Sequence, residues 1–155
     1  MFRGERFREH RAFVRNGLIA TGAGAVASLG FAELVDYLFK NPEVTSVTAT
    51  VSDALFSNGV FWPLHYFSNK DKYTTTENKF NYKPFITDIG KAYTAGAIGT
   101  VIFYGTFTTL NDLFLRVSSF RPVISTITSY SIATLLSVVP TMYLLDKIRF
   151  LRQHK

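Results

Sequence analysis

Two long stretches of the sequence contain no charged residue, and they limit the possible fold more than any other feature. Residues 92–111 form a run of 20 residues without Asp, Glu, Lys or Arg, and residues 122–145 form a run of 24. A helix of about 20 residues rises 1.5 Å per residue and crosses a hydrocarbon layer of roughly 30 Å. A soluble helix of that length carries a charged face, because one side meets water. The two runs therefore predict two transmembrane helices.

Two further apolar stretches precede them, and each is interrupted by acidic residues. Residues 17–39 contain Glu33 and Asp36, and residues 44–64 contain Asp53. Each stretch is long enough to cross a bilayer. We therefore expect an all-α membrane protein with four transmembrane helices.

The placement of the cations predicts the orientation of these helices. Of the 17 Lys and Arg residues, 14 fall before the first span, in or beside the connection between the second and third spans, or after the fourth span. Because an even number of spans returns the chain to its starting side, these groups share one side. The positive-inside rule then places both termini in the cytoplasm or its organellar equivalent. We expect the charges to contact anionic lipid headgroups rather than nucleic acid.

A repeat predicts how the four spans are paired. An offset of 77 residues matches the second span with the fourth, and an offset of 75 matches the first with the third. The matched pairs are Ser52 with Ser129, Pro63 with Pro140, Tyr66 with Tyr143, Lys70 with Lys147, Gly24 with Gly99, Gly30 with Gly105 and Phe39 with Phe114. This indicates two tandem helical hairpins that arose by internal duplication and are related by an axis along the membrane normal.

The repeat also divides the chain into five segments. A basic cytoplasmic or interfacial segment covers residues 1–16, and the first hairpin covers 17–70. A polar linker covers 71–89, the second hairpin covers 90–147, and a basic tail covers 148–155. The N-terminal segment is expected either to lie flat at the interface, aromatic side down, or to form a frayed tail.

Four carboxylates form the candidate polar site: Asp53, Glu33, Asp36 and Asp112. The predicted topology places them toward the same leaflet, where they would converge on a cation or proton site, because a charged group in lipid is costly. The alternative is that Glu33, Asp36 and Asp112 reach headgroup water, which leaves Asp53 as the single deep carboxylate.

The sequence shows no sign of a metal, a cofactor or a catalytic motif. There are no cysteines, and the three histidines map to the cation-rich side, away from the acids. Phosphate-binding loops, dinucleotide fingerprints, nucleophile elbows and zinc signatures are missing. We expect neither a cofactor nor a metal, and no enzymatic activity.

Small residues recur every four positions on the first and third spans. The two rows are Ala20, Gly24 and Ser28, and Ala92, Gly96 and Thr100. Such rows let helix backbones approach closely in lipid. They predict either packing inside this bundle or docking of a partner subunit.

The segments FVRNGLIATGAG and FSNGVFWPLHYF give the chain a resemblance to the GtrA-like family of small four-span membrane proteins. The resemblance is carried by Phe13 and Gly17 at the start of the first span and Asn58 near the end of the second. The basic pair and the aromatic residue that follow this asparagine in the family are not present here. The resemblance implies a role in moving or presenting polyprenyl-linked sugars.

Two functions are consistent with these features. The first is a non-catalytic accessory subunit of a larger membrane complex, for example a respiratory, photosynthetic or monooxygenase complex. Its expected partners are other integral membrane subunits and membrane lipids. The alternative is a GtrA-like transporter or flippase component for a lipid-linked sugar or a cationic solute.

Overall fold

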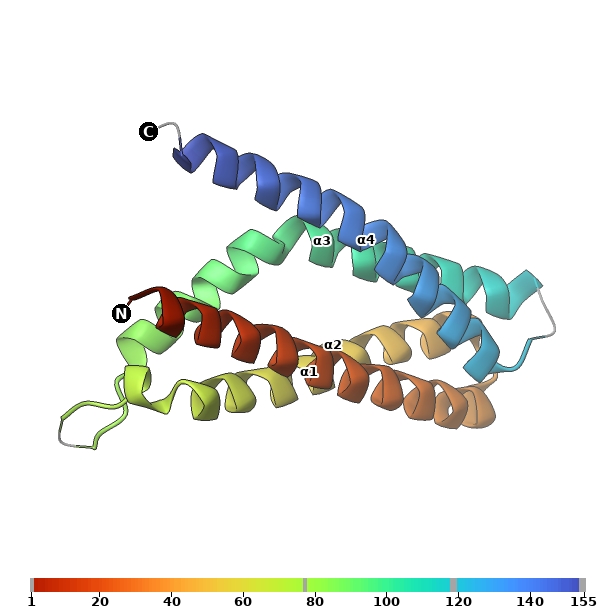
Figure 1. Ribbon diagram of the computed structural model, residues 1–155. Helices are drawn as coiled ribbons and strands as arrows, with labels where there is room; N and C mark the ends of the chain where they lie inside the picture. Colours follow the sequence, from red (N-terminus) through yellow and green to blue (C-terminus); the bar gives the residue numbers. More distant parts are fainter. Residues whose placement is uncertain (1, 77, 118–119, 154–155) are drawn as a thin grey trace.

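The described part of the chain folds into four long helices and one short one (Figure 1). The computed structural model describes the backbone of residues 2–76, 78–117 and 120–153 and the side chains of residues 11–76, 78–94, 96–117 and 120–137. The elements are α1 (Phe2–Phe39), α2 (Pro42–Ser68), the 3₁₀ helix η1 (Lys70–Tyr73), α3 (Tyr82–Val117) and α4 (Pro122–Gln153). The prediction of an all-α fold is confirmed.

The four long helices form two antiparallel hairpins that run alongside each other (Figure 1). Helix α1 packs along α2, and α3 packs along α4; between the hairpins, α2 contacts α3 and α1 contacts α4. The start of α1, the end of α4 and the α2–α3 connection lie at the left-hand end in Figure 1. The α1–α2 and α3–α4 turns lie at the opposite end.

Local sequence explains the turn between α1 and α2. Lys40 adopts a left-handed conformation with φ of 47°, which reverses the chain after Phe39. Asn41 then caps α2, because its side-chain oxygen accepts hydrogen bonds from the backbone N–H of Glu43 at 3.0 Å and of Val44 at 3.3 Å. Pro42 occupies the first helical position, where its missing N–H costs nothing.

The helices extend beyond the predicted segment boundaries. Residues 2–16, expected to be a separate basic segment, continue into α1 without a break. Within the predicted linker 71–89, η1 is followed by a short loop that an antiparallel bridge between Thr74 and Phe80 closes. Helix α3 already begins at Tyr82, before the predicted start of the second hairpin at residue 90.

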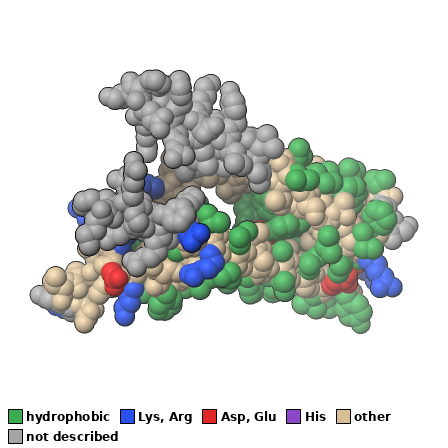
Figure 2. Space-filling model, in the orientation of Figure 1, with side chains coloured by type: hydrophobic (Ala, Val, Ile, Leu, Met, Phe, Trp, Pro, Cys, Tyr) green, Lys and Arg blue, Asp and Glu red, His purple; other side chains and the backbone are tan. Residues whose placement is uncertain are grey.

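The core of the bundle is small and polar, whereas the outside is apolar. One residue from each long helix forms the central hydrophobic cluster: Ala32, Ala49, Phe107 and Ala133, all 0% exposed. Most other buried side chains are polar, among them Asn16, Ser28, Thr45, Ser46, Ser52, Asp53, Asn111, Ser125, Thr126 and Ser129. Large apolar side chains are exposed on all four long helices. Figure 2 shows them covering much of the right-hand half of the visible face, with charged groups toward the two ends.

The four predicted spans all lie within helices. Among the residues whose side chains are described, one segment, Arg11–Phe39, is long and apolar enough to cross a membrane by length and composition. The side chains of residues 138–145, which belong to the predicted fourth span, lie outside the described residues.

Candidate functional site

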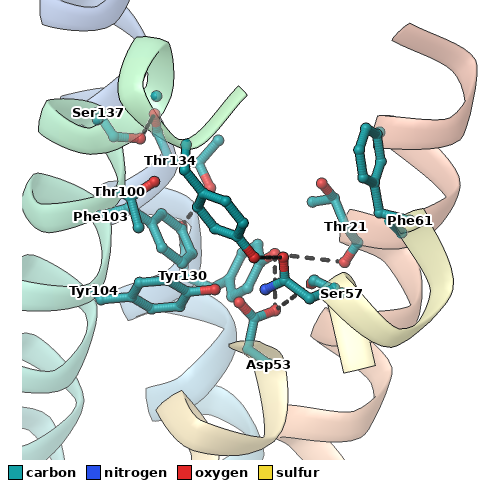
Figure 3. A pocket seen from close by; sticks show the side chains of 16 residues that line it. Thr21, Asp53, Ser57, Phe61, Thr100, Phe103, Tyr104, Tyr130, Thr134 and Ser137 are labelled. Atoms are coloured by element: carbon teal, nitrogen blue, oxygen red, sulfur yellow. Dashed lines mark hydrogen bonds between the residues drawn. The ribbon is translucent and has the colours of Figure 1, made fainter. Parts of the chain in front are cut away.

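A cavity of about 490 Å³ lies between the two hairpins (Figure 3). All four long helices contribute to its wall. The lining residues are Gly17, Ala20, Thr21, Asp53, Ser57, Asn58, Phe61, Tyr93, Gly96, Gly99, Thr100, Phe103, Tyr104, Tyr130, Thr134 and Ser137. The wall contains side chains with a hydroxyl, amide or carboxylate as well as aromatic rings and glycines.

Asp53 is the carboxylate of this cavity, and Gly24 determines how closely α1 approaches it. Asp53 lies on α2 and is 2% exposed. A Cβ atom at Gly24 would collide with the Asp53 carboxylate and the Ser57 hydroxyl and would lie 2.9 Å from the Asp53 carbonyl oxygen. The absence of a side chain at this position therefore lets the two backbones approach at the level of the carboxylate.

Tyrosines from the second hairpin approach the same carboxylate. The Tyr130 hydroxyl lies 3.3 Å from Asp53 Oδ1 and 3.4 Å from the carbonyl oxygen of Thr21, so it connects α4 with both helices of the first hairpin. The Ser57 hydroxyl donates to Asp53 Oδ1 at 3.4 Å. The Tyr104 hydroxyl points toward the carboxylate from α3 (Figure 3). The carboxylate is thus surrounded by hydroxyl groups from α2, α3 and α4.

Asn58 and Tyr93 form a second polar part of the wall. The Tyr93 hydroxyl donates to Asn58 Oδ1 at 2.6 Å, while Asn58 Nδ2 donates to the carbonyl of Ala54 at 2.7 Å. The rings of Phe61 and Phe103 also line the cavity. Donors, acceptors and aromatic faces are therefore available within one cavity.

The other three predicted acids lie away from this cavity. Glu33 is about 13 Å along α1 from the level of Gly24, and its Oε1 accepts from the backbone N–H of Val123 at 3.3 Å. Asp112 pairs with Arg116 at 2.7 Å. Asp36 lies half-buried near the end of α1. The structure thus separates Asp53 from Glu33, Asp36 and Asp112, because the acids occupy different levels of the bundle.

The two rows of small residues have different surroundings. Ala20, Gly24 and Ser28 are buried in the bundle, and Ala20 also lines the cavity. Gly96 and Thr100 line the cavity from α3, whereas Ala92 is half-buried and does not line it. The row on α1 therefore lies at a contact between helices, and most of the row on α3 lies beside the cavity.

A hydrogen-bonded network at the cation-rich end was not anticipated from the sequence. Buried His65 Nε2 lies 2.9 Å from the Tyr73 hydroxyl, which donates to Asp88 Oδ2 at 2.6 Å, and Lys72 forms an ion pair with the same oxygen. Burial raises the pKa of Asp88, but the hydrogen bonds and charge of its partners outweigh it and lower that pKa overall. The fold of the linker brings these groups together, and no sequence spacing signals it.

The described residues contain no group of three His, Asp or Glu side chains arranged to hold a metal ion. The side chains of His10 and His154 lie outside the described residues.

Comparison with known proteins finds no matching family model, no similar curated protein and no similar solved structure.

Proposed function

We propose that the chain is an integral membrane protein with four spans, α1 to α4. Both of its termini then lie on the cation-rich side of the membrane. The distribution of polarity supports this placement. Serine, threonine, asparagine and aspartate side chains are buried, whereas residues such as Leu18, Val26, Val101 and Leu135 are about 70% exposed. A bundle with a polar interior and an apolar exterior is stable in lipid, where small residues and interhelical hydrogen bonds hold helices together.

We propose that the cavity around Asp53 binds the sugar of a polyprenyl-linked glycan donor, while the lipid chain of the donor stays in the bilayer. The cavity has a volume of about 490 Å³, larger than a single bare ion occupies. The volume lies in the range of small-molecule sites. The carboxylate and the amide can accept hydrogen bonds from sugar hydroxyls, and the aromatic rings can cover the apolar face of a sugar ring.

The residues that carry the GtrA-like resemblance support the same proposal. Gly17 and Asn58 both line the cavity. Phe13 packs edge-on against Phe61, which also lines it, with ring centroids 5.2 Å apart. Two of the three positions therefore line the cavity, and the third packs against a ring in its wall.

An Asp53→Asn variant tests this function. The full chain is reconstituted in proteoliposomes that contain a fluorescent polyprenyl phosphoglucose, and binding is followed through the emission of Trp62, the single tryptophan. Trp62 contacts the rings of both Phe61 and Tyr93, which line the cavity. Losing the charge of a hydrogen-bonded acceptor should weaken binding about tenfold or more.

Glu33→Gln is the matched control for this test, because it removes one negative charge outside the cavity and keeps an oxygen for the Val123 N–H. The control is expected to bind like the unaltered chain. Unchanged affinity in Asp53→Asn, or an equal loss in both variants, would refute the sugar-binding proposal.

A second candidate function is an accessory subunit of a larger membrane complex, which one surface feature favours. A groove of about 570 Å³ on the outside of α1 and α2 is lined by Gly22, Ala23, Val26, Ala27, Gly30, Phe31, Leu34 and Phe56. Small residues beside exposed aromatics suit the close approach of another transmembrane helix. Mild solubilisation, native-gel sizing and mass spectrometry of co-migrating proteins test this function, and migration of the chain alone would count against it.

A further inference from the structure

A second cavity, of about 660 Å³, lies at the cation-rich end of the bundle. It lies between the first half of α1 and the end of α2, and its wall consists of Arg11, Ala12, Arg15, Ser68, Asn69, Asp71 and Lys72. Three of these side chains are cationic and one is acidic, so the wall carries a net positive charge. Nothing in the Asp53 site accounts for this cavity, because the two share no lining residue.

Hydrogen bonds hold the turn of α1 that carries Arg15 against the end of α2. Arg11 and Arg15 are four residues apart and therefore lie on one face of the helix. Arg15 Nη2 donates to the Ser68 hydroxyl at 3.2 Å, and the fully buried Asn16 donates to the same oxygen at 3.0 Å. The guanidinium of Arg15 is thus oriented at the rim of the cavity by a contact between two helices.

The histidine network positions the third cation. Lys72 forms an ion pair with Asp88, which Tyr73 and His65 hold in place from the buried side. Asp88 belongs to α3, so this pair connects the linker with the second hairpin. The ion pair with Asp88 therefore holds Lys72 beside the cavity, while its side chain stays 41% exposed.

We propose that this cavity binds a phosphate group, with Arg11 and Arg15 as the principal ligands and Lys72 as an additional positive charge. Guanidinium groups match phosphate oxygens through paired N–H donors, and an ammonium group adds attraction without geometric demand. The Ser68 hydroxyl adds a neutral donor to the same wall, whereas the Asn69 amide is already bonded to the His65 carbonyl oxygen at 2.9 Å. The inference rests on the membrane placement proposed above, but not on sugar binding at Asp53.

The phosphate source that this location favours is a lipid headgroup. The cavity lies at the end of the bundle where the positive-inside rule places the cytoplasmic interface, and cations there attract anionic lipids. A soluble phosphate would use the same three cations. The experiment below therefore includes both sources.

Lipid retention by the purified full chain tests the site. The protein is exchanged into phosphatidylcholine nanodiscs with 10% phosphatidic acid, and retained phosphatidic acid is quantified by native mass spectrometry after release into detergent. The double variant Arg11→Gln/Arg15→Gln should retain about tenfold less phosphatidic acid, because it loses two charge-assisted hydrogen-bond donors. The matched control is Lys83→Gln/Lys91→Gln, which removes two exposed cations that do not line the cavity.

The outcomes separate a built site from a diffuse charge effect. Loss in the arginine variant with retention in the lysine variant supports the site, whereas equal loss in both variants, or loss in neither, overturns it. Inorganic phosphate at millimolar concentration is added in a second arm, and displacement of phosphatidic acid identifies a pocket open to soluble phosphate as well. If the double variant does not fold, Arg15→Lys keeps the charge but loses the paired donors, and unaltered retention in that variant overturns the proposal. Retention in Asp53→Asn is expected to be unchanged, which keeps this test independent of the sugar site.

Discussion

Replacing Phe107 with alanine is expected to lower the free energy of unfolding by about 3–5 kcal/mol. Phe107 is the largest apolar side chain in the central cluster, and its ring packs against Phe103 at 5.8 Å and Tyr130 at 5.5 Å. Its other neighbours in the cluster are alanines from the remaining three helices, which cannot fill the space left by the ring. The substitution therefore removes the contact that all four helices share.

Thermal unfolding of the detergent-solubilised chain, followed by near-ultraviolet circular dichroism, measures this effect. Phe120→Ala is the matched control, because Phe120 is 50% exposed and lies outside the cluster. The control should change the free energy of unfolding by no more than about 0.5 kcal/mol. Equal stability of the two variants would show that the hairpins are not held together at this cluster.

The helices could be predicted from the sequence because their signal is local. The charge-free runs 92–111 and 122–145 and the interrupted runs 17–39 and 44–64 all lie inside helices. Within each hairpin, the opposite directions of the two helices follow from their short connection. The exact helix starts could not be predicted, since segments 2–16 and 82–91 carry charged residues and lack the long apolar run that marks a membrane helix.

The candidate site was predicted only in part, because it depends on contacts between distant segments. Asp53 was singled out as a deep carboxylate, and it lies in the cavity. Its partners Tyr104 and Tyr130 were not recognised, since tyrosine in a membrane helix is ordinarily assigned to the interface. His65 was assigned to the correct end of the bundle, but its contact with Tyr73 depends on the fold of the linker.

One contact in the cavity bears on the proposed duplication. The offset of 77 residues that matches α2 with α4 also equates Asp53 with Tyr130 and Ser57 with Thr134. Asp53 and Tyr130 approach to 3.3 Å, and all four residues line the cavity. Two repeats related by a twofold axis bring equated residues together where the axis passes between them. An internal duplication would therefore place this axis in the cavity, between Asp53 and Tyr130.

Replacing Gly24 with alanine is expected to disturb both the stability of the bundle and the Asp53 site. The added methyl group would collide with the Asp53 carboxylate and the Ser57 hydroxyl, and it would lie 2.9 Å from a backbone oxygen that cannot rotate away. Helix α1 must then shift away from α2 at the level of the cavity. Such overpacking costs about 1–3 kcal/mol, and we expect it to weaken sugar binding along with the fold because the carboxylate is displaced.

Gly22→Ala provides the control that isolates the packing effect. Gly22 lies on the same helix, and a Cβ atom there would have no heavy atom within 4 Å. Both variants gain the same helix propensity, about 1 kcal/mol relative to glycine. The difference between their free energies of unfolding therefore reports the collision alone, and it should amount to about 1–3 kcal/mol in favour of Gly22→Ala. If both variants were equally stable and both bound the lipid-linked sugar normally, the close approach of α1 to Asp53 would have no role in forming the site.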